Sequence, residues 1–283
     1  DMGRDGCSSG FFLLIQLSFR TIMIRAVFLD IDGTLVSFTT HRIPQSTVDA
    51  LTEFHNGGGK VYISTGRPIA IVNNIGQVEG FVDGYITFNG AYSFVGEREV
   101  NCDAIPDGDV KAMIDDARRN DYTVLVCGKR DLAIYNYHDV FNDVFVKGLG
   151  VSCIDPSKPV SDLKGQPILQ LTPFFNISAE KEVMGQMPHS VSARWNPNFT
   201  DITVRGADKG HALRMMAEAE GLDVSECMAF GDGGNDISIL KAAGIGVAMG
   251  NAADDVKAAA DYVTTHVDDN GIANALRHYG AIK

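Results

Sequence analysis

Short apolar segments alternate with amphipathic helical patterns in the N-terminal third of this chain. Residues 24–29 are apolar at nearly every position, which is typical of a strand buried on both faces of a parallel sheet. A helical pattern follows at residues 44–56, a second strand pattern at 60–64, a helix start at Pro68 and a third strand pattern at 85–88. Such alternation predicts an α/β fold with a doubly wound, mostly parallel, Rossmann-like core sheet.

The pattern changes after Ala91 and returns after Arg205. Between them we expect strands at 93–100, 122–126, 132–137 and 191–195, and helices at 109–120 and 178–187. After Arg205 we expect helices at 209–220, 236–243 and 252–260, and strands at 227–230 and 246–249. Insertion of a domain into a surface loop is physically tolerated. We therefore predict a core of residues 23–91 and 204–283, interrupted by an inserted α+β cap domain of residues 92–203.

The net charge, the N-terminal segment and the cysteine pattern limit the class and location of the protein. The formal net charge of −12 opposes binding to nucleic acid, which requires a basic surface. The apolar run at 11–19 is shorter than the roughly 20 residues that span a bilayer, and we interpret residues 1–22 as an extension outside the fold. The five cysteines form no Cys-x-x-Cys pair, which favours a reducing, cytoplasmic location. No feature of the sequence indicates an obligate protein partner.

Two carboxylates follow the first predicted strand directly. Asp30 and Asp32 come after residues 24–29, and Gly33 allows the chain to turn there. Ligands of open α/β sheets bind beyond the carboxyl ends of the strands, so this is where an active site is expected. The alternative is a polar turn or a helix cap, because aspartate is common in both.

Three further polar clusters lie at strand ends or helix starts. They are Ser64-Thr65-Gly66-Arg67, Asp208-Lys209-Gly210 and Gly231-Asp232-Gly233-Gly234-Asn235-Asp236. Backbone N–H groups at a helix start favour anions. Asp30, Asp32 and Asp232 offer the oxygen ligands that suit a hard cation, and Mg²⁺ fits best because it is commonly held by a few carboxylates together with substrate phosphates. A Walker A motif is absent from the sequence, so a P-loop NTPase is excluded.

Taken in order, the four clusters resemble the motifs of the haloacid dehalogenase-like superfamily. The late Gly-Asp-x-x-Asn-Asp form, with Phe88-Asn89-Gly90-Ala91 before the insertion, resembles the Cof-type branch. Members of that branch carry a large α/β cap between the second and third motifs. The resemblance extends from about Met23 to the end of the chain and implies an enzyme that acts on phosphate esters.

The resemblance also implies roles for individual residues. Asp30 would attack phosphorus and form an aspartyl-phosphate, and Asp32 would serve as general acid and then general base. Mg²⁺ would be held by the carboxylates of Asp30 and Asp232 and the main-chain carbonyl of Asp32, with Gly233 nearby. Phosphoryl oxygens would contact Ile31, Thr65, Gly66, Lys209 and Asn235. Asp236 would orient Lys209 or a water on the metal, and Thr34 and Arg67 would likewise support the groups that touch metal or phosphate.

Asp32 distinguishes between branches of this superfamily. Dehalogenases need no acid at this position, and P-type ATPases resemble Asp-Lys-Thr-Gly-Thr there and need membrane helices. We therefore expect a Mg²⁺-dependent phosphatase that hydrolyses small phosphorylated metabolites, with sugar phosphates first among them. The alternatives are a phosphomutase of related fold and a non-catalytic sensor of phosphorylated metabolites.

Overall fold

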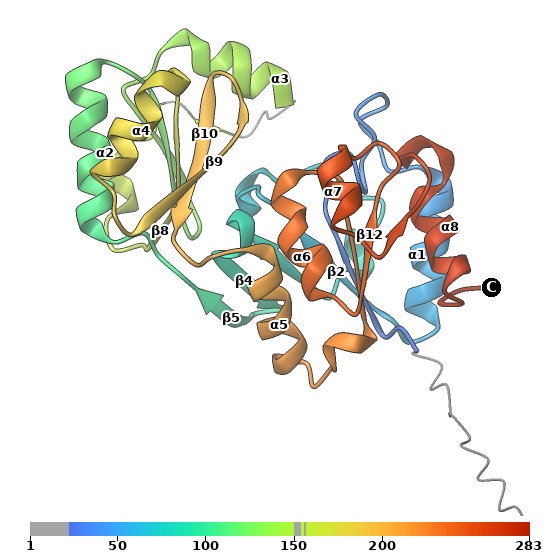
Figure 1. Ribbon diagram of the computed structural model, residues 1–283. Helices are drawn as coiled ribbons and strands as arrows, with labels where there is room; N and C mark the ends of the chain where they lie inside the picture. Colours follow the sequence, from blue (N-terminus) through green and yellow to red (C-terminus); the bar gives the residue numbers. More distant parts are fainter. Residues whose placement is uncertain (1–22, 150–153, 156) are drawn as a thin grey trace, which may run out of the picture.

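The computed structural model describes residues 23–149, 154, 155 and 157–283. Within this part of the chain the strands form one eight-stranded and one five-stranded sheet, each with its own helices (Figure 1). The interpretation of residues 1–22 as an extension concerns residues outside the described part. None of the helices in the described part is long and apolar enough to cross a bilayer.

The eight-stranded sheet has the strand order β13-β12-β11-β1-β2-β3-β4-β5. Its strands from β13 to β3 run parallel, whereas β4 and β5 continue the sheet in antiparallel pairing. The strands are β1 (Ala26–Leu29), β2 (Lys60–Ser64), β3 (Gly84–Thr87), β4 (Tyr92–Val95), β5 (Arg98–Cys102), β11 (Cys227–Gly231), β12 (Ile245–Ala248) and β13 (Tyr262–Val263).

Helices cover both faces of this sheet, as a doubly wound fold requires (Figure 1). On one face, Val27 and Leu29 of β1 share an apolar cluster with α1 (Gln45–Asn56) and α8 (Gly271–His278). On the other, Ala26 and Phe28 pack into a cluster with α5 (Lys209–Ala219), α6 (Ile237–Ala242) and α7 (Asp254–Ala258). This alternation along one buried strand confirms the predicted α/β class.

The five-stranded sheet is antiparallel throughout, in the order β7-β6-β8-β10-β9. Helices α2 (Asp107–Asn120) and α4 (Ile177–Gly185) pack on one of its faces. A π-helical segment at Phe141–Val146, continued by α3 (Lys147–Leu149), contributes to the apolar cluster on the other face. The strands are β6 (Val124–Gly128), β7 (Leu132–Tyr135), β8 (Ile168–Pro173), β9 (Ser190–Asn196) and β10 (Phe199–Val204).

The second apolar cluster of the five-stranded sheet also joins the two sheets. It brings Phe88 and Ala91, which follow β3, together with Phe174 and Phe199. The sequence interpretation placed residues from 92 onward in the cap, yet β4 and β5 pair with the edge of the large sheet. A hairpin pattern does not encode which sheet it joins, and the division of the chain into core and cap domains stays a prediction.

The helix predicted from Pro68 is wrong. The structure has isolated 3₁₀ turns at Ile69–Ile71 and Glu79–Phe81, and residues 72–78 between them are irregular. Proline is well suited to the first position of a helix, but this local preference does not sustain one. Asn73, Asn74 and Gly76 follow directly, and these residue types favour turns over helix.

Candidate active site

The polar clusters meet at one edge of the large sheet. Asp30 follows β1, Thr65 follows β2, and Asp232 follows β11. Because these strands are parallel neighbours, their carboxyl ends lie at the same edge. The three side chains line a single pocket of about 870 Å³.

Asp30 and Lys209 form a buried ion pair at the centre of this edge. The Nζ atom of Lys209 lies 2.6 Å from Oδ1 of Asp30 and 2.6 Å from Oδ1 of Asp236. Lys209 is fully buried, and Asp30 is 7% exposed. Burial lowers the pKa of the Lys209 amine, but the Asp236 and Asp30 carboxylates outweigh this effect and hold that pKa above its usual value. The two carboxylates thus favour the charged ammonium form of Lys209.

Burial and the neighbouring Asp236 carboxylate raise the pKa of Asp30 well above its usual value, against the opposing effect of Lys209. The other carboxylate oxygen of Asp30, Oδ2, accepts no hydrogen bond from any described residue. Asp30 thus has one oxygen fixed by Lys209 and a second that is available for chemistry.

Asp236 fixes the loop that carries Asp232. Its Oδ2 accepts hydrogen bonds from the backbone N–H groups of Asp232 (3.0 Å) and Gly233 (2.9 Å), while its Oδ1 accepts from Lys209. Both oxygens of Asp236 are therefore occupied by donors. Asp236 is therefore a positioning residue that holds Lys209 and the backbone of residues 232–233 together.

Asp232 is oriented by two side chains from other elements. Its Oδ1 accepts a hydrogen bond from the Thr34 hydroxyl at 2.9 Å, and its Oδ2 accepts one from the Asn251 amide at 3.3 Å. Burial raises the pKa of Asp232 to about 6, although the Thr34 hydrogen bond opposes this shift. Gly33 has φ +87°, and a Cβ there would lie 2.3 Å from Oδ2 of Asp232. The turn after β1 thus approaches Asp232 as closely as glycine allows.

An acidic cluster suited to a divalent cation results. One carboxylate oxygen from each of Asp30, Asp232 and Asp236 lies within 4.8 Å of the other two. With the Lys209 ammonium counted, the cluster formally carries two negative charges in excess, which a divalent cation would neutralise. The donors are oxygens, as hard divalent cations prefer.

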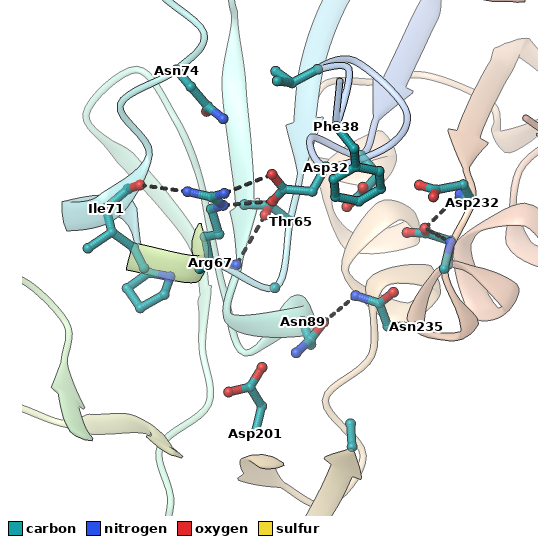
Figure 2. A pocket seen from close by; sticks show the side chains of 18 of the residues that line it. Asp32, Phe38, Thr65, Arg67, Ile71, Asn74, Asn89, Asp201, Asp232 and Asn235 are labelled. Carbon is teal, nitrogen blue, oxygen red and sulfur yellow. Dashed lines mark hydrogen bonds and ion pairs between the residues drawn. The ribbon is translucent and has the colours of Figure 1, made fainter. Parts of the chain in front are cut away.

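The Asp32 carboxylate lies outside this cluster and contacts Arg67 (Figure 2). Nε and Nη2 of Arg67 donate to its two oxygens at 2.7 Å each, a bidentate pair. Nη1 of Arg67 also donates to the Ile71 carbonyl at 3.3 Å. Arg67 therefore sets the direction of the Asp32 carboxylate, and the expected metal contact of Asp32 concerns its main-chain carbonyl.

Of the expected phosphate-binding residues, Thr65, Gly66 and Asn235 line the same pocket, whereas the fully buried Ile31 and Lys209 do not. The Thr65 hydroxyl accepts a hydrogen bond from the Arg67 N–H at 3.1 Å, and Asn235 donates to Oδ1 of Asn89 at 2.9 Å. Within the described part of the chain, no residue accepts a hydrogen bond from the backbone N–H groups of Ile31 and Gly66. Two free backbone donors thus accompany the Thr65 hydroxyl and the Asn235 amide.

Sequence reasoning gave no site role to two asparagines, Asn251 and the motif residue Asn89. Asn251 bridges the Gly33 carbonyl (2.8 Å) and Asp232, and Asn89 pairs with Asn235. Both follow parallel strands, β12 and β3, so the strand-end rule that found Asp30 and Asp232 could have found them too. It also missed Gln170 and Asp201 of the second sheet, which line the same pocket.

Comparison with known proteins finds a family of hydrolases and several phosphatases. Residues 27–276 match the family model of haloacid dehalogenase-like hydrolases. The putative phosphatase YkrA of Bacillus subtilis (strain 168) is 28% identical over 264 residues, which cover 92% of this chain and 99% of that protein. The pyridoxal phosphate phosphatase YbhA of Escherichia coli (strain K12) is 28% identical over 266 residues, covering 89% and 97% of the two chains.

Comparison with solved structures also finds a phosphatase. A sugar phosphatase of haloacid dehalogenase subclass IIB is 43% identical, with a TM-score of 0.84 over 91% of this chain and all of that one. The chain therefore belongs to the haloacid dehalogenase-like hydrolase family and is a phosphatase of its Cof-type branch.

Proposed function

We propose that this phosphatase hydrolyses small phosphorylated metabolites through a covalent intermediate on Asp30. The observation that carries the proposal is the bonding of Asp30, one oxygen of which is fixed by Lys209 while the other is open. Oδ2 of Asp30 attacks phosphorus, an Asp30–phosphorus bond forms, and the bond from phosphorus to the leaving oxygen breaks. Water then attacks the same phosphorus and releases inorganic phosphate and free Asp30.

Asp32 supplies the proton in the first step and recovers it in the second. Its carboxyl group protonates the leaving oxygen as that bond breaks, and its carboxylate then takes a proton from the attacking water. It lines the pocket beside Asp30, and Arg67 holds its direction by two hydrogen bonds. Because both Asp32 oxygens accept from Arg67, one of these two hydrogen bonds must open when the protonated Asp32 donates to the leaving oxygen at hydrogen-bond distance.

The phosphoryl oxygens bind the donors around Asp30. These are the Thr65 hydroxyl, the Lys209 ammonium, the Asn235 amide and the N–H groups of Ile31 and Gly66. Because the donors are fixed before the reaction, they stabilise charge on the transferring group without reorganisation.

Mg²⁺ is the cation we assign to the acidic cluster. Asp30, Asp232 and the main-chain carbonyl of Asp32 would hold it, with Gly233 nearby, while Thr34, Asn251 and Asp236 keep these ligands in place. The oxygen-only donors and the excess negative charge support this choice. When bound, the cation would neutralise phosphoryl charge as a Lewis acid.

Sugar phosphates are the substrate class we propose. The structural relative in subclass IIB is a sugar phosphatase, and the relative YbhA acts on pyridoxal phosphate, another small phosphate monoester. The pocket of about 870 Å³ has room for a small metabolite.

A phosphate-release screen tests this function. We expect the purified protein with Mg²⁺ to release inorganic phosphate from p-nitrophenyl phosphate and from several sugar phosphates. EDTA should lower the rate about a hundredfold, and added Mg²⁺ should restore it, because metal charge stabilisation amounts to several kcal/mol. Full activity in EDTA would refute the metal assignment. Phosphoryl transfer to a second sugar that is faster than hydrolysis would identify a phosphomutase instead.

Metal binding should also stabilise the fold more at neutral than at acidic pH. The pKa of Asp232 is raised to about 6 in the folded protein, above its ordinary value near 4. The stability contributed by the protonated group is fully present below about 4 and is lost as the pH rises through about 6. We expect Mg²⁺ to raise the Tm more at pH 7.5 than at pH 5.0, because protons compete with the cation below pH 6.

Differential scanning calorimetry at the two pH values, with Mg²⁺ or with EDTA, measures this difference. Asp232→Asn should weaken the Mg²⁺ shift and reduce its pH dependence, with Asp30 still titrating, whereas Asp254→Asn, at an exposed position outside the pocket, should keep both unchanged. Equal Mg²⁺ shifts at both pH values in the unmodified protein would contradict the assignment.

A further inference from the structure

The five-stranded sheet contributes a buried polar cluster to the wall of the active-site pocket. Gln170 on β8 and Asp201 on β10 line this pocket together with Asp30 and Asp32. Gln170 is 2% exposed and Asp201 is 6% exposed. In Figure 2 the Asp201 carboxylate points toward the interior of the pocket. Burying polar side chains in the middle of a sheet costs free energy unless they are hydrogen-bonded, so their presence at this wall indicates a functional role.

Hydrogen bonds within the cluster fix the orientation of the Gln170 amide. Its Nε2 donates to Oδ1 of Asp201 at 3.0 Å and to the Thr172 hydroxyl at 3.2 Å. The Thr172 hydroxyl in turn donates to the same Asp201 oxygen at 2.8 Å. Because a carboxylate can only accept, Nε2 must face Asp201, and Oε1 must face the other way.

The amide oxygen of Gln170 is left without a donor. Oε1 is buried and accepts no hydrogen bond from any described residue. An unpaired buried acceptor costs about 1–3 kcal/mol, so such atoms in folded proteins usually have an identifiable partner or role. A ligand that supplies a hydroxyl to Oε1 would recover this free energy.

Cations on the same wall are already committed to protein groups. The guanidinium of Arg194 pairs with Glu180 and donates to the main-chain carbonyls of Phe199 at 3.1 Å and Asn196 at 3.2 Å. Lys147 lies 2.6 Å from Asp143. The wall therefore presents acceptors, Gln170 and Asp201, and no uncommitted positive charge among the described residues that line it.

The mouth of the pocket is lined by an apolar aromatic side chain, in contrast to the polar wall. Phe38, which is 64% exposed, lines it. Figure 2 shows its ring over the site, between Asp32 and Asp232. A sugar combines an apolar C–H face, which can cover such a ring, with hydroxyl donors at its edge.

We propose that Gln170 and Asp201 form the subsite that binds the hydroxyl groups of a neutral sugar phosphate. Sugar hydroxyls donate to Oε1 of Gln170 and to the Asp201 carboxylate, while the phosphoryl group lies at Asp30. The negative charge of Asp201 disfavours substrates that carry a carboxylate on the leaving group. The proposal rests on the phosphatase activity proposed above and assigns the residues that select its substrate.

Matched phosphate esters and the variant Gln170→Met test this subsite. Methionine has a similar length and shape but no hydrogen-bonding amide. We expect the ratio of kcat/KM for glucose 6-phosphate to kcat/KM for p-nitrophenyl phosphate to fall about tenfold, the factor that corresponds to one lost hydrogen bond. Gln186→Met, the same change at an exposed position directly after α4 and outside the pocket, should leave the ratio unchanged.

The charge of Asp201 is tested with esters that differ in charge. The unmodified protein should prefer sorbitol 6-phosphate to 6-phosphogluconate, an open-chain ester of the same length whose C1 group is a carboxylate instead of a hydroxymethyl group. Asp201→Asn should narrow that preference severalfold, an effect that a purely structural role would not produce. A preference for glucosamine 6-phosphate of more than tenfold, lost in Asp201→Asn, would overturn the hydroxyl assignment in favour of an ammonium.

Failure of the subsite and failure of the activity are distinguishable. No phosphate release from any ester by the unmodified protein in Mg²⁺ would overturn the proposed function itself. Hydrolysis of p-nitrophenyl phosphate with a ratio that Gln170→Met changes less than twofold would overturn only the subsite. Circular dichroism and the Tm of each variant show whether a change in the ratio occurs in folded protein.

Discussion

Asp30→Asn should abolish hydrolysis of p-nitrophenyl phosphate, with a fall in kcat of about 10⁴-fold or more. The amide has the same shape as the carboxylate but is a very weak nucleophile, so no bond to phosphorus forms. Lys209 can still donate to the amide oxygen, as it does to Oδ1 of Asp30 at 2.6 Å. The active-site geometry should therefore survive while the chemistry is lost.

Stability separates this effect from unfolding. Because burial raises the pKa of Asp30, its ionised form is costly at neutral pH, and an uncharged amide should leave the Tm of the metal-free protein unchanged or higher. Asp254→Asn, the same substitution at an exposed site outside the pocket, should retain full activity. Activity of Asp30→Asn within tenfold of the unmodified protein would exclude Asp30 as the nucleophile.

Lys209→Met should destabilise the metal-free protein by about 3–5 kcal/mol at pH 7.5. Methionine replaces most of the buried aliphatic stem, but Asp30 and Asp236 lose the ammonium that lies 2.6 Å from each of them. Two buried carboxylates without a cation repel one another and lack compensation. For a chain of this size we expect a decrease in Tm of about 10 °C, together with loss of activity.

The destabilisation should shrink as the pH falls, because protonation of Asp30 removes the repulsion. Lys241→Met, at an exposed position on α6, is the matched control and should change the Tm by less than about 2 °C. Thermal unfolding of both variants at pH 7.5 and 5.0 makes the comparison. A decrease for Lys209→Met that is as small as that of the control would contradict the central role of this ion pair.

The fold class and the position of the site could be predicted because both depend on local patterns. Residues buried on both faces of β1 make it a continuous apolar run, and the chain turns polar at Asp30 where the strand ends.

Other features of the fold depend on tertiary context. The β4–β5 hairpin extends the large sheet, which its own residues do not encode, and β8, whose Leu169 and Leu171 alternate with Gln170 and Thr172, was overlooked despite its period of two.

Contacts within the site were less predictable than the residues that form it. The sequence placed Asp32 beside Asp30, but the bidentate pair between Asp32 and Arg67 depends on how the turn after β2 faces the turn after β1. Gln170 and Asp201 come from strands 31 positions apart that become neighbours only in the sheet. No local motif marks such a pair, because the chemistry arises from strand order.

Chemical trapping of the phosphorylated enzyme tests the central claim most directly. In Asp32→Asn the second step should be slow, because no group accepts a proton from water, while p-nitrophenolate departs without an acid. Acid quenching during turnover, followed by borohydride reduction, converts an aspartyl-phosphate to homoserine, which peptide mass spectrometry locates. We predict homoserine at position 30, dependent on substrate. Phosphate release without conversion of any aspartate, or conversion at Asp232 in place of Asp30, would contradict the mechanism.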